Sequence, residues 1–363
     1  MKKVIFISAL AIAAAASCTK SDIVDTKFND AIGFEAYVGR DAQTKAELLT
    51  INEFTTAGIY GFYTGANGWD GTSTFTANIW NNGTLSKDGT VSPTRFWTNA
   101  TDKYSFLAYA PKDDSHITLP ATGTTSITFA VDANIPSQKD LIYANAINKV
   151  KPSGDATTIP MQFKHALSRL TVKASVTAAT PFEYHIKEVS INGGFITSDE
   201  LNLATGLWKK DGAAVDPTTP GQDATETTPA KNPVYPTTYT FYTNNTVDQA
   251  NALPVVTTET PAKNFAVRGE KADNYLMMIP VDFTEKKAYL TVKYSTYYRS
   301  TETNGSLESD VYTKTFEVDT DFKAGQAYSI DLVFVQATDN EIKFTVSEDA
   351  WDSEETSIIN PAN

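Results

Sequence analysis

Few side chains in this sequence could carry out covalent or metal chemistry. The 363 residues include a single cysteine, Cys18, and three histidines, which are too few for a disulfide framework or a structural zinc site. A serine nucleophile at a strand-to-helix turn would show the pattern Gly-x-Ser-x-Gly, and a phosphate-binding loop would show its own glycine spacing. The sequence contains neither pattern. We therefore expect no enzyme, no cofactor and no metal.

Each histidine has a simpler structural interpretation than a catalytic one. His165 and His185 lie in strand-like stretches, where a packed, hydrogen-bonded histidine is the favoured interpretation. An enzyme that depends on His165 stays a third hypothesis. His116 follows Asp113 and Asp114 closely and could contribute to a weak cation site, although a solvated turn is the favoured interpretation.

Acidic residues outnumber basic ones by 43 to 30, which leaves a formal net charge of −13. Such a charge repels the phosphate backbone of nucleic acid and an anionic membrane surface, so we expect no nucleic-acid partner. In a chain this acidic, neighbouring carboxylates arise by chance. Asp199–Glu200 and Glu354–Glu355 have the residue types of a glycosidase pair, but no further feature selects them.

Three tryptophans of the first half, Trp69, Trp80 and Trp97, lie in or beside Gly- and Asn-rich stretches. Exposed aromatic rings on loops can stack on sugars or anchor a protein partner. Packing in the core is the favoured interpretation of these rings, and a sugar-binding role stays open beside it.

The chain begins with the pattern of an export signal. A charged start is followed by uncharged, mostly apolar residues over Val4–Ala16, a stretch too short to span a bilayer. Cys18 stands where a lipoprotein signal places its acylated residue, although Ala15 replaces the usual leucine. We expect residues 1–17 to be removed and Cys18 to carry the lipid that anchors the precursor in the outer membrane. Ordinary secretion with an inert Cys18 is the alternative.

The elements that must position these residues are strands. Alternating apolar and polar residues indicate strands with one buried face, and no segment offers twelve or more residues at a helical period. The clearest alternation lies in Leu170–Val176, Leu290–Tyr294 and Tyr328–Phe334. Shorter candidates are Ile32–Val38, Ile59–Tyr63, Tyr104–Tyr109, Ile127–Val131, Leu141–Tyr143, Val189–Ile191, Tyr275–Ile279 and Val311–Val318. Many short strands predict an all-β fold of β-sandwiches.

Length and composition predict two domains in tandem. A break in pattern at Lys151–Asp155 suggests a boundary near residue 155. The Pro- and Thr-rich residues 211–238 predict a long exposed loop. The predicted parts of the chain are a tether (18–31), an N-terminal sandwich (32–155), a C-terminal sandwich (156–340) and a tail (341–363).

The two ends of the mature chain have complementary features. The strand at Ile32–Val38 is followed at once by the basic residues Arg40 and Lys45, and exposed segments of this kind are where proteases cut. The tail has the pattern of a strand with no obvious hairpin partner. Its apolar residues are Ile342, Phe344, Val346, Trp351, Ile358 and Ile359.

Short motifs in both halves of the chain share the arrangement of a known family. They are the lipoprotein-type start ending at Cys18, Ile32–Phe34 leading to Thr44–Ala46, Phe96–Trp97 through Tyr104–Ala110, and Gln138–Ala144 followed by Phe163–Leu170. The last is the most specific. Together they resemble the fimbrillins, or Mfa-like subunits, of lipoprotein-derived type V pili. That family often has arginine at the position of Lys45.

The resemblance implies a mechanism of assembly. It implies two transthyretin-like β-sandwich domains, export as a lipoprotein, and a cut after Arg40 or Lys45 that frees the first strand. The strand's removal leaves an apolar groove with unpaired backbone groups, which accepts another chain by strand addition. In the family the occupant is the C-terminal strand of a neighbouring subunit, here the tail. The implied product is a surface fimbrium of pilin subunits that contributes to adhesion, with a host or bacterial surface ligand possible.

A binding protein is the main alternative. In that hypothesis the chain stays a monomeric, surface-anchored adhesin or glycan-binding lipoprotein that uses Trp69, Trp80 or residues 211–238. Polymerisation and a free mature N-terminus distinguish the first hypothesis from the second.

Overall fold

The computed structural model describes residues 31–38, 55–71, 73–98, 100–119, 125–153, 158–177, 182–209, 237–243, 253, 262–264, 275–284, 287–298, 311–335 and 341–350. Within these ranges the regular elements are strands, apart from the short 3-10 helix η1 (Ile135–Ser137). The all-β fold class is confirmed. No helix in the same ranges is long and apolar enough to cross a membrane.

The first sheet has seven strands in the order β1–β9–β8–β5–β2–β3–β4. They are β1 (Phe34–Val38), β2 (Thr56–Gly65), β3 (Trp80–Ser86), β4 (Val91–Ser92), β5 (Lys103–Ala110), β8 (Ile142–Lys149) and β9 (Ile159–His165). The central strand β5 is buried on both faces, because Phe106 packs into one apolar cluster and Leu107 into another. The Phe106 cluster includes Ile32 and Phe34, so the first strand contributes to this core.

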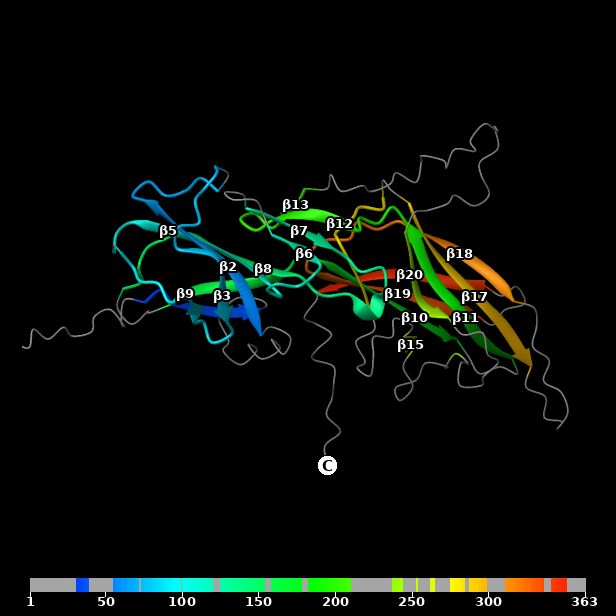
Figure 1. Ribbon diagram of the computed structural model, residues 1–363. Helices are drawn as coiled ribbons and strands as arrows, with labels where there is room; N and C mark the ends of the chain where they lie inside the picture. Colours follow the sequence, from blue (N-terminus) through cyan, green and yellow to red (C-terminus); the bar gives the residue numbers. More distant parts are fainter. Residues whose placement is uncertain are drawn as a thin grey trace, which may run out of the picture.

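A four-stranded sheet in the order β13–β12–β7–β6 closes over the Leu107 cluster. Its strands are β6 (Ile117–Thr118), β7 (Ser126–Ala130), β12 (Ser198–Asn202) and β13 (Leu207–Trp208). Alternation explains its burial: Ile127 and Phe129 are buried, whereas the residues between them are only partly so. In Figure 1 these strands lie between the first sheet and the remaining strands.

Two further sheets enclose a single large core, and we call them the second sandwich; we call the seven-stranded sheet and the four-stranded sheet over it the first sandwich. One sheet, β14–β11–β17–β18, contains β11 (Phe182–Gly193), β14 (Thr237–Thr243), β17 (Ala288–Tyr298) and β18 (Tyr312–Val318). The other, β15–β10–β19–β20 with β16 also on β10, contains β10 (Ser168–Val176), β15 (Lys263–Asn264), β16 (Leu276–Met278), β19 (Gln326–Val335) and β20 (Glu341–Ala350). Figure 1 shows these sheets at the end of the molecule opposite β2, β3 and β9.

Three strand pairings cross the boundary expected near residue 155. Strand β9 pairs with β8 and β1, so a division at 155 would cut the first sheet. Strand β12 pairs with β7, which returns residues 198–208 to the first sandwich. The sheets therefore divide the chain after His165, and residues 198–208 later return to the sheet that contains β7.

The tail also differs from its sequence interpretation. It was expected to have no hairpin partner, yet β20 pairs antiparallel with β19 along its whole length, from Glu341 opposite Val335 to Ala350 opposite Gln326. The expectation of one wetter face on residues 169–176 is likewise wrong. Arg169, Thr171 and Ser175 are buried too, and the Arg169 guanidinium lies 5.2 Å from the ring centroid of Tyr275.

Candidate functional site

Strand β1 lies on β9 as a parallel neighbour, with Phe34 opposite Ile159 and Val38 opposite Phe163. The amide of Ile159 donates to the carbonyl oxygen of Gly33 at 3.0 Å. The parallel arrangement is tertiary in origin, because more than a hundred residues separate the two strands in the chain and no tight turn can join parallel strands.

The opposite edge of β1 is also paired. The Ile32 amide donates to the Arg95 carbonyl at 2.9 Å, and the Phe34 amide donates to the Gly89 carbonyl at 3.1 Å. Ala31 forms an isolated antiparallel bridge with Phe96. We call residues 86–96 the clasp. We use the term slot for the space between β9 and the clasp, in which β1 lies. Because the clasp follows β3 and contains β4, the seven-stranded sheet curls until its last strands reach its first.

The side chains of the first strand complete the core beneath it. Phe34 is 2% exposed and Ile32 is 4% exposed. The Phe34 ring packs edge-on against Phe106, with the centroids 5.0 Å apart, and tilts against Trp80 at 6.0 Å. Tyr37 is also buried, although it lies outside the Phe106 cluster. Together, burying Ile32, Phe34 and Tyr37 contributes about 5–9 kcal/mol in gross terms. Loss of β1 would therefore expose a substantial apolar groove.

Local hydrogen bonds hold the clasp in its turn. The Gly89 amide donates to the Ser86 carbonyl and the Ser86 amide to the Thr90 carbonyl, both at 2.9 Å. The Asp88 carboxylate accepts from the Thr90 hydroxyl at 2.8 Å and from the Thr90 amide at 3.0 Å. These hydrogen bonds hold the pKa of Asp88 below its usual value. Asp-Gly is a strong sequence signal for a hairpin turn, but nothing in the sequence shows which strand that turn contacts.

The described part of the tail lies against its own core. In β20, Ile342, Phe344 and Val346 are partly buried and pack on the second sandwich, while Lys343 and Thr345 point outward. The Phe344 ring stacks on Phe316 of β18, with the centroids 5.2 Å apart and the planes 4° from parallel. The remaining predicted processing, anchoring and donor residues lie outside the described residues: Cys18, Arg40, Lys45, Trp351, Ile358 and Ile359.

The histidines each pair with a carboxylate, on three different parts of the fold. His165 Nδ1 lies 2.6 Å from Asp140 Oδ2 at the end of β9, and His185 Nε2 lies 3.2 Å from Glu183 Oε2 on β11. His185 is 1% exposed, as expected of a packed histidine. None of the described residues forms a group of three or more His, Cys, Asp or Glu side chains that could hold a metal ion.

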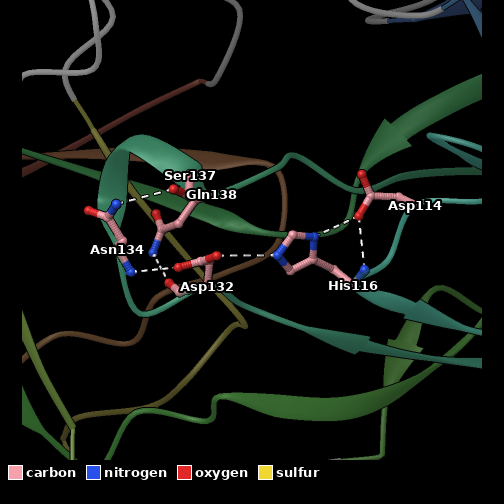
Figure 2. Close-up of polar contacts among 6 residues, drawn as sticks. All are labelled: Asp114, His116, Asp132, Asn134, Ser137 and Gln138. Atoms are coloured by element: carbon pink, nitrogen blue, oxygen red, sulfur yellow. Dashed lines mark hydrogen bonds and ion pairs between the residues drawn. The ribbon is translucent and has the colours of Figure 1, made fainter.

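His116 lies in the turn before β6, between two carboxylates (Figure 2). Its Nδ1 lies 2.6 Å from Asp114 Oδ1 and its Nε2 lies 3.4 Å from Asp132 Oδ2. The hydrogen bond to Asp114 raises the pKa of His116, burial opposes it, and the contact with Asp132 adds to the rise. This arrangement favours an imidazolium that donates from both nitrogens, which is a structural tie between turns.

The acidic pair Asp199–Glu200 is not arranged as two facing carboxylates. Asp199 is buried, and its Oδ1 accepts from the backbone amide of Glu200 at 2.8 Å. Glu200 is exposed and lies within 3.9 Å of Lys209. The second pair, Glu354–Glu355, lies outside the described residues.

The tryptophans are core residues. Trp69, Trp80 and Trp97 are each less than 10% exposed. Trp69 donates from Nε1 to the Ser73 carbonyl at 2.9 Å, and Trp80 donates to the Pro93 carbonyl at 2.7 Å. The hypothesis that they are exposed, sugar-stacking rings is therefore wrong, because none of the three rings is exposed to solvent. Of residues 211–238, only Thr237 and Thr238 are described, and they begin β14.

Residues 44–351 match the sequence profile of the family described as fimbrillin-like. The chain belongs to the fimbrillin-like family. The match covers every strand from β2 to β20 and leaves out only β1, and it confirms the resemblance drawn from the short motifs. No protein of curated function matches the sequence of this fimbrillin-like chain.

A search of solved structures found a shared fold for this fimbrillin-like protein. A fimbrial protein from Bacteroides vulgatus is similar with a TM-score of 0.65 at 20% identity, over 88% of this chain and 99% of that one. A putative cell adhesion protein from Bacteroides ovatus has a TM-score of 0.47 at 13% identity, over 88% of this chain and 97% of that one. At 20% identity, the similarity to the Bacteroides vulgatus protein establishes the fold alone.

Proposed function

We propose that this chain is a structural subunit of a cell-surface pilus and that it joins its neighbours by strand exchange. Family membership and the fold shared with a fimbrial protein support the pilus role. The observation that carries the mechanism is the position of β1. It is the first described strand, it fills a core, and its onward connection runs through the basic residues Arg40 and Lys45.

In this proposal the precursor is exported and held in the outer membrane by lipid on Cys18. A protease cuts after Arg40 or Lys45, and the fragment that carries β1 is then retained only by non-covalent contacts. Its departure exposes the groove over Phe106 and leaves backbone groups of β9 and the clasp unpaired. An unpaired edge of this kind is a template for another strand.

The donor is the tail of a neighbouring subunit. Strand β20 already pairs with β19, so we assign the reaching segment to residues after Ala350, which include Trp351, Ile358 and Ile359. Burying these three side chains gains about 5–9 kcal/mol in gross terms, comparable to what β1 contributes, before the costs of ordering and association. Head-to-tail joining of this type does not close, so it produces a filament.

The test is the mature N-terminus of surface material together with its assembly state. We expect mass spectrometry to find an N-terminus at Asp41 or Ala46, and unboiled samples to show high-molecular-weight ladders. Deleting residues 351–363 should abolish the ladders while leaving processing intact. A mature pool that begins only at an acylated Cys18, without ladders, would contradict the proposal.

A further inference from the structure

The slot in which β1 lies has two walls of backbone, and the second wall belongs to the clasp. We propose that the clasp, through Gly89 and Arg95, determines which strands the slot accepts. The carbonyl oxygens of Gly89 and Arg95 are two hydrogen-bond acceptors. An incoming strand can pair with both only if it has free N–H groups on two residues that are two positions apart. This inference rests on the proposed strand exchange, which it deepens by naming what the incoming strand must provide.

The direction of the backbone groups supports the division of the slot into two sides. Successive residues of a strand direct their N–H and C=O groups to alternate edges. The Gly33 carbonyl accepts from β9, whereas the Ile32 and Phe34 amides donate to the clasp. Ile32 and Phe34 also bury their side chains in the core. An occupant must therefore combine apolar side chains with free amides at the same two positions.

This requirement excludes proline from either clasp-facing position. Proline has no N–H group, so it would leave the Gly89 or Arg95 carbonyl without its partner. The reaching segment after Ala350 contains one proline, Pro361. The clasp therefore predicts a register in which Ile358 or Ile359 enters the core and Pro361 lies away from both clasp-facing positions.

Gly89 sets the clearance between the clasp and any occupant. Its φ is +83°, and a Cβ added there would lie 1.7 Å from the Phe34 carbonyl oxygen. Because the clashing atom is backbone, every occupant in the register of β1 would meet the same obstacle. The hydrogen bonds of the turn, including those of Asp88, restrict the clasp from moving aside.

The clasp can be tested by comparing Gly89→Ala with Gly71→Ala in the full chain. Gly71 has a φ of +85° and no atom within 4 Å of an added Cβ, so both variants share the backbone strain and only Gly89→Ala adds the clash. We expect amide hydrogen exchange at Ile32 and Phe34 to be about tenfold faster in Gly89→Ala than in Gly71→Ala. Equal protection in the two variants would overturn the proposal.

A milder variant keeps the test decisive if Gly89→Ala does not fold. Asp88→Ala removes the carboxylate that accepts from Thr90 and introduces no clash. Because Gly89 lies in that turn and Arg95 lies beyond it, exchange should accelerate more at Phe34 than at Ile32. If both amides exchange as slowly in Asp88→Ala as in the unsubstituted protein, the proposal is again overturned.

Assembly then tests the acceptance of an incoming strand. We expect ladders of protease-trimmed Gly89→Ala to dissociate at a lower temperature than those of trimmed Gly71→Ala. The two kinds of ladder could instead be equally heat-stable even though the Ile32 and Phe34 amides exchange faster in the Gly89→Ala precursor. That result would show that the clasp holds only β1, and it would overturn the proposal that the clasp determines which strands the slot accepts. If the unsubstituted trimmed protein forms no ladders, the proposed function fails, whereas the exchange measurements still judge whether the clasp pairs with β1.

Discussion

At the scale of single residues, the core beneath the first strand depends on one aromatic side chain more than on any other of β1. Phe34 contacts both Phe106 and Trp80, and those rings also contact each other at 6.1 Å. The cluster thus joins β1 to β3 and β5.

The substitution Phe34→Ala should therefore destabilise the first sandwich. We expect a loss of about 3–5 kcal/mol in the free energy of unfolding, which is typical when a buried phenylalanine is truncated. Denaturant unfolding measures it. Glu35→Ala is the control, because Glu35 is exposed on the same strand and should change the free energy by less than about 0.5 kcal/mol. Equal effects of the two substitutions would contradict the burial of Phe34.

His116 should make stability depend on pH. Its pKa is raised by hydrogen bonding to Asp114, so the folded state binds a proton more tightly than the unfolded state. The resulting stabilisation is fully present below the unfolded pKa of about 6.5 and is lost as pH rises through the higher folded pKa. For this partly exposed group, His116→Gln should lower Tm by about 1–2 °C at low pH and by less above the folded pKa.

Thermal melts of the protein and of His116→Gln across that range measure the effect. The charged groups facing the ring are Asp114 and Asp132, and Lys139 interacts with Asp114. A difference in Tm that grows with increasing pH would contradict the assigned direction.

At the scale of elements, β20 divides the tail into two parts with different roles. Residues up to Ala350 form a strand of the second sandwich, and Phe344 stacks on Phe316 across the two sheets. In the proposed strand exchange, the residues after Ala350 would pair with the neighbouring subunit, and β20 would hold the start of that donor segment on its own subunit.

Two truncations should therefore behave differently. Deleting 351–363 should leave the Tm of the monomer within about 1–2 °C of the full chain, since it removes nothing from the core described. Deleting 341–363 should cost about 3–5 kcal/mol, because three partly buried apolar side chains of β20 are lost. Calorimetry of the monomers measures both. Equal destabilisation by the two deletions would contradict this division of the tail.

At the scale of the whole molecule, the two sandwiches share buried groups. Gln138 is 1% exposed; it donates from Nε2 to the Asp132 carbonyl at 3.0 Å and accepts at Oε1 from the Met277 amide of β16 at 2.8 Å. Met277 and Ile279 pack into the apolar cluster of the first sandwich. A filament built from such subunits would transmit tension through this junction.

Removing that bridge should weaken the whole chain. Gln138→Ala leaves the buried Met277 amide without its partner and should cost about 1–3 kcal/mol, which is about 1–4 °C in Tm at this size. Asn134→Ala is the control, because Asn134 is exposed and its side chain contacts only the nearby Ser137 in Figure 2. Thermal melts that shift equally for both variants would contradict the bridging role.

Local pattern in the sequence was enough to predict the all-β fold class, many of the strands and the family. Alternation over residues 290–294 and 328–334 predicted parts of β17 and β19, because the period of two follows from the geometry of a single strand. The motifs at Gln138–Ala144 and Phe163–Leu170 indicated the family because they preserve residue types at fixed spacing. His185 and the three tryptophans were also favoured correctly as packed residues.

Only the tertiary structure decided which strands pair. The candidate site depends on this pairing, because the slot is formed by β9 and the clasp on either side of β1. Nothing local in Phe34–Val38 specifies Ile159–His165 as its parallel neighbour, nor the turn at Gly89 as its second one. The same holds for β12 with β7 and for β20 with β19. A strand's own residues determine which of its faces is apolar, but its backbone can pair with any edge. The partner is therefore chosen by the packing of the complete core, which selects the arrangement that buries Phe34, Phe106 and Trp80 together.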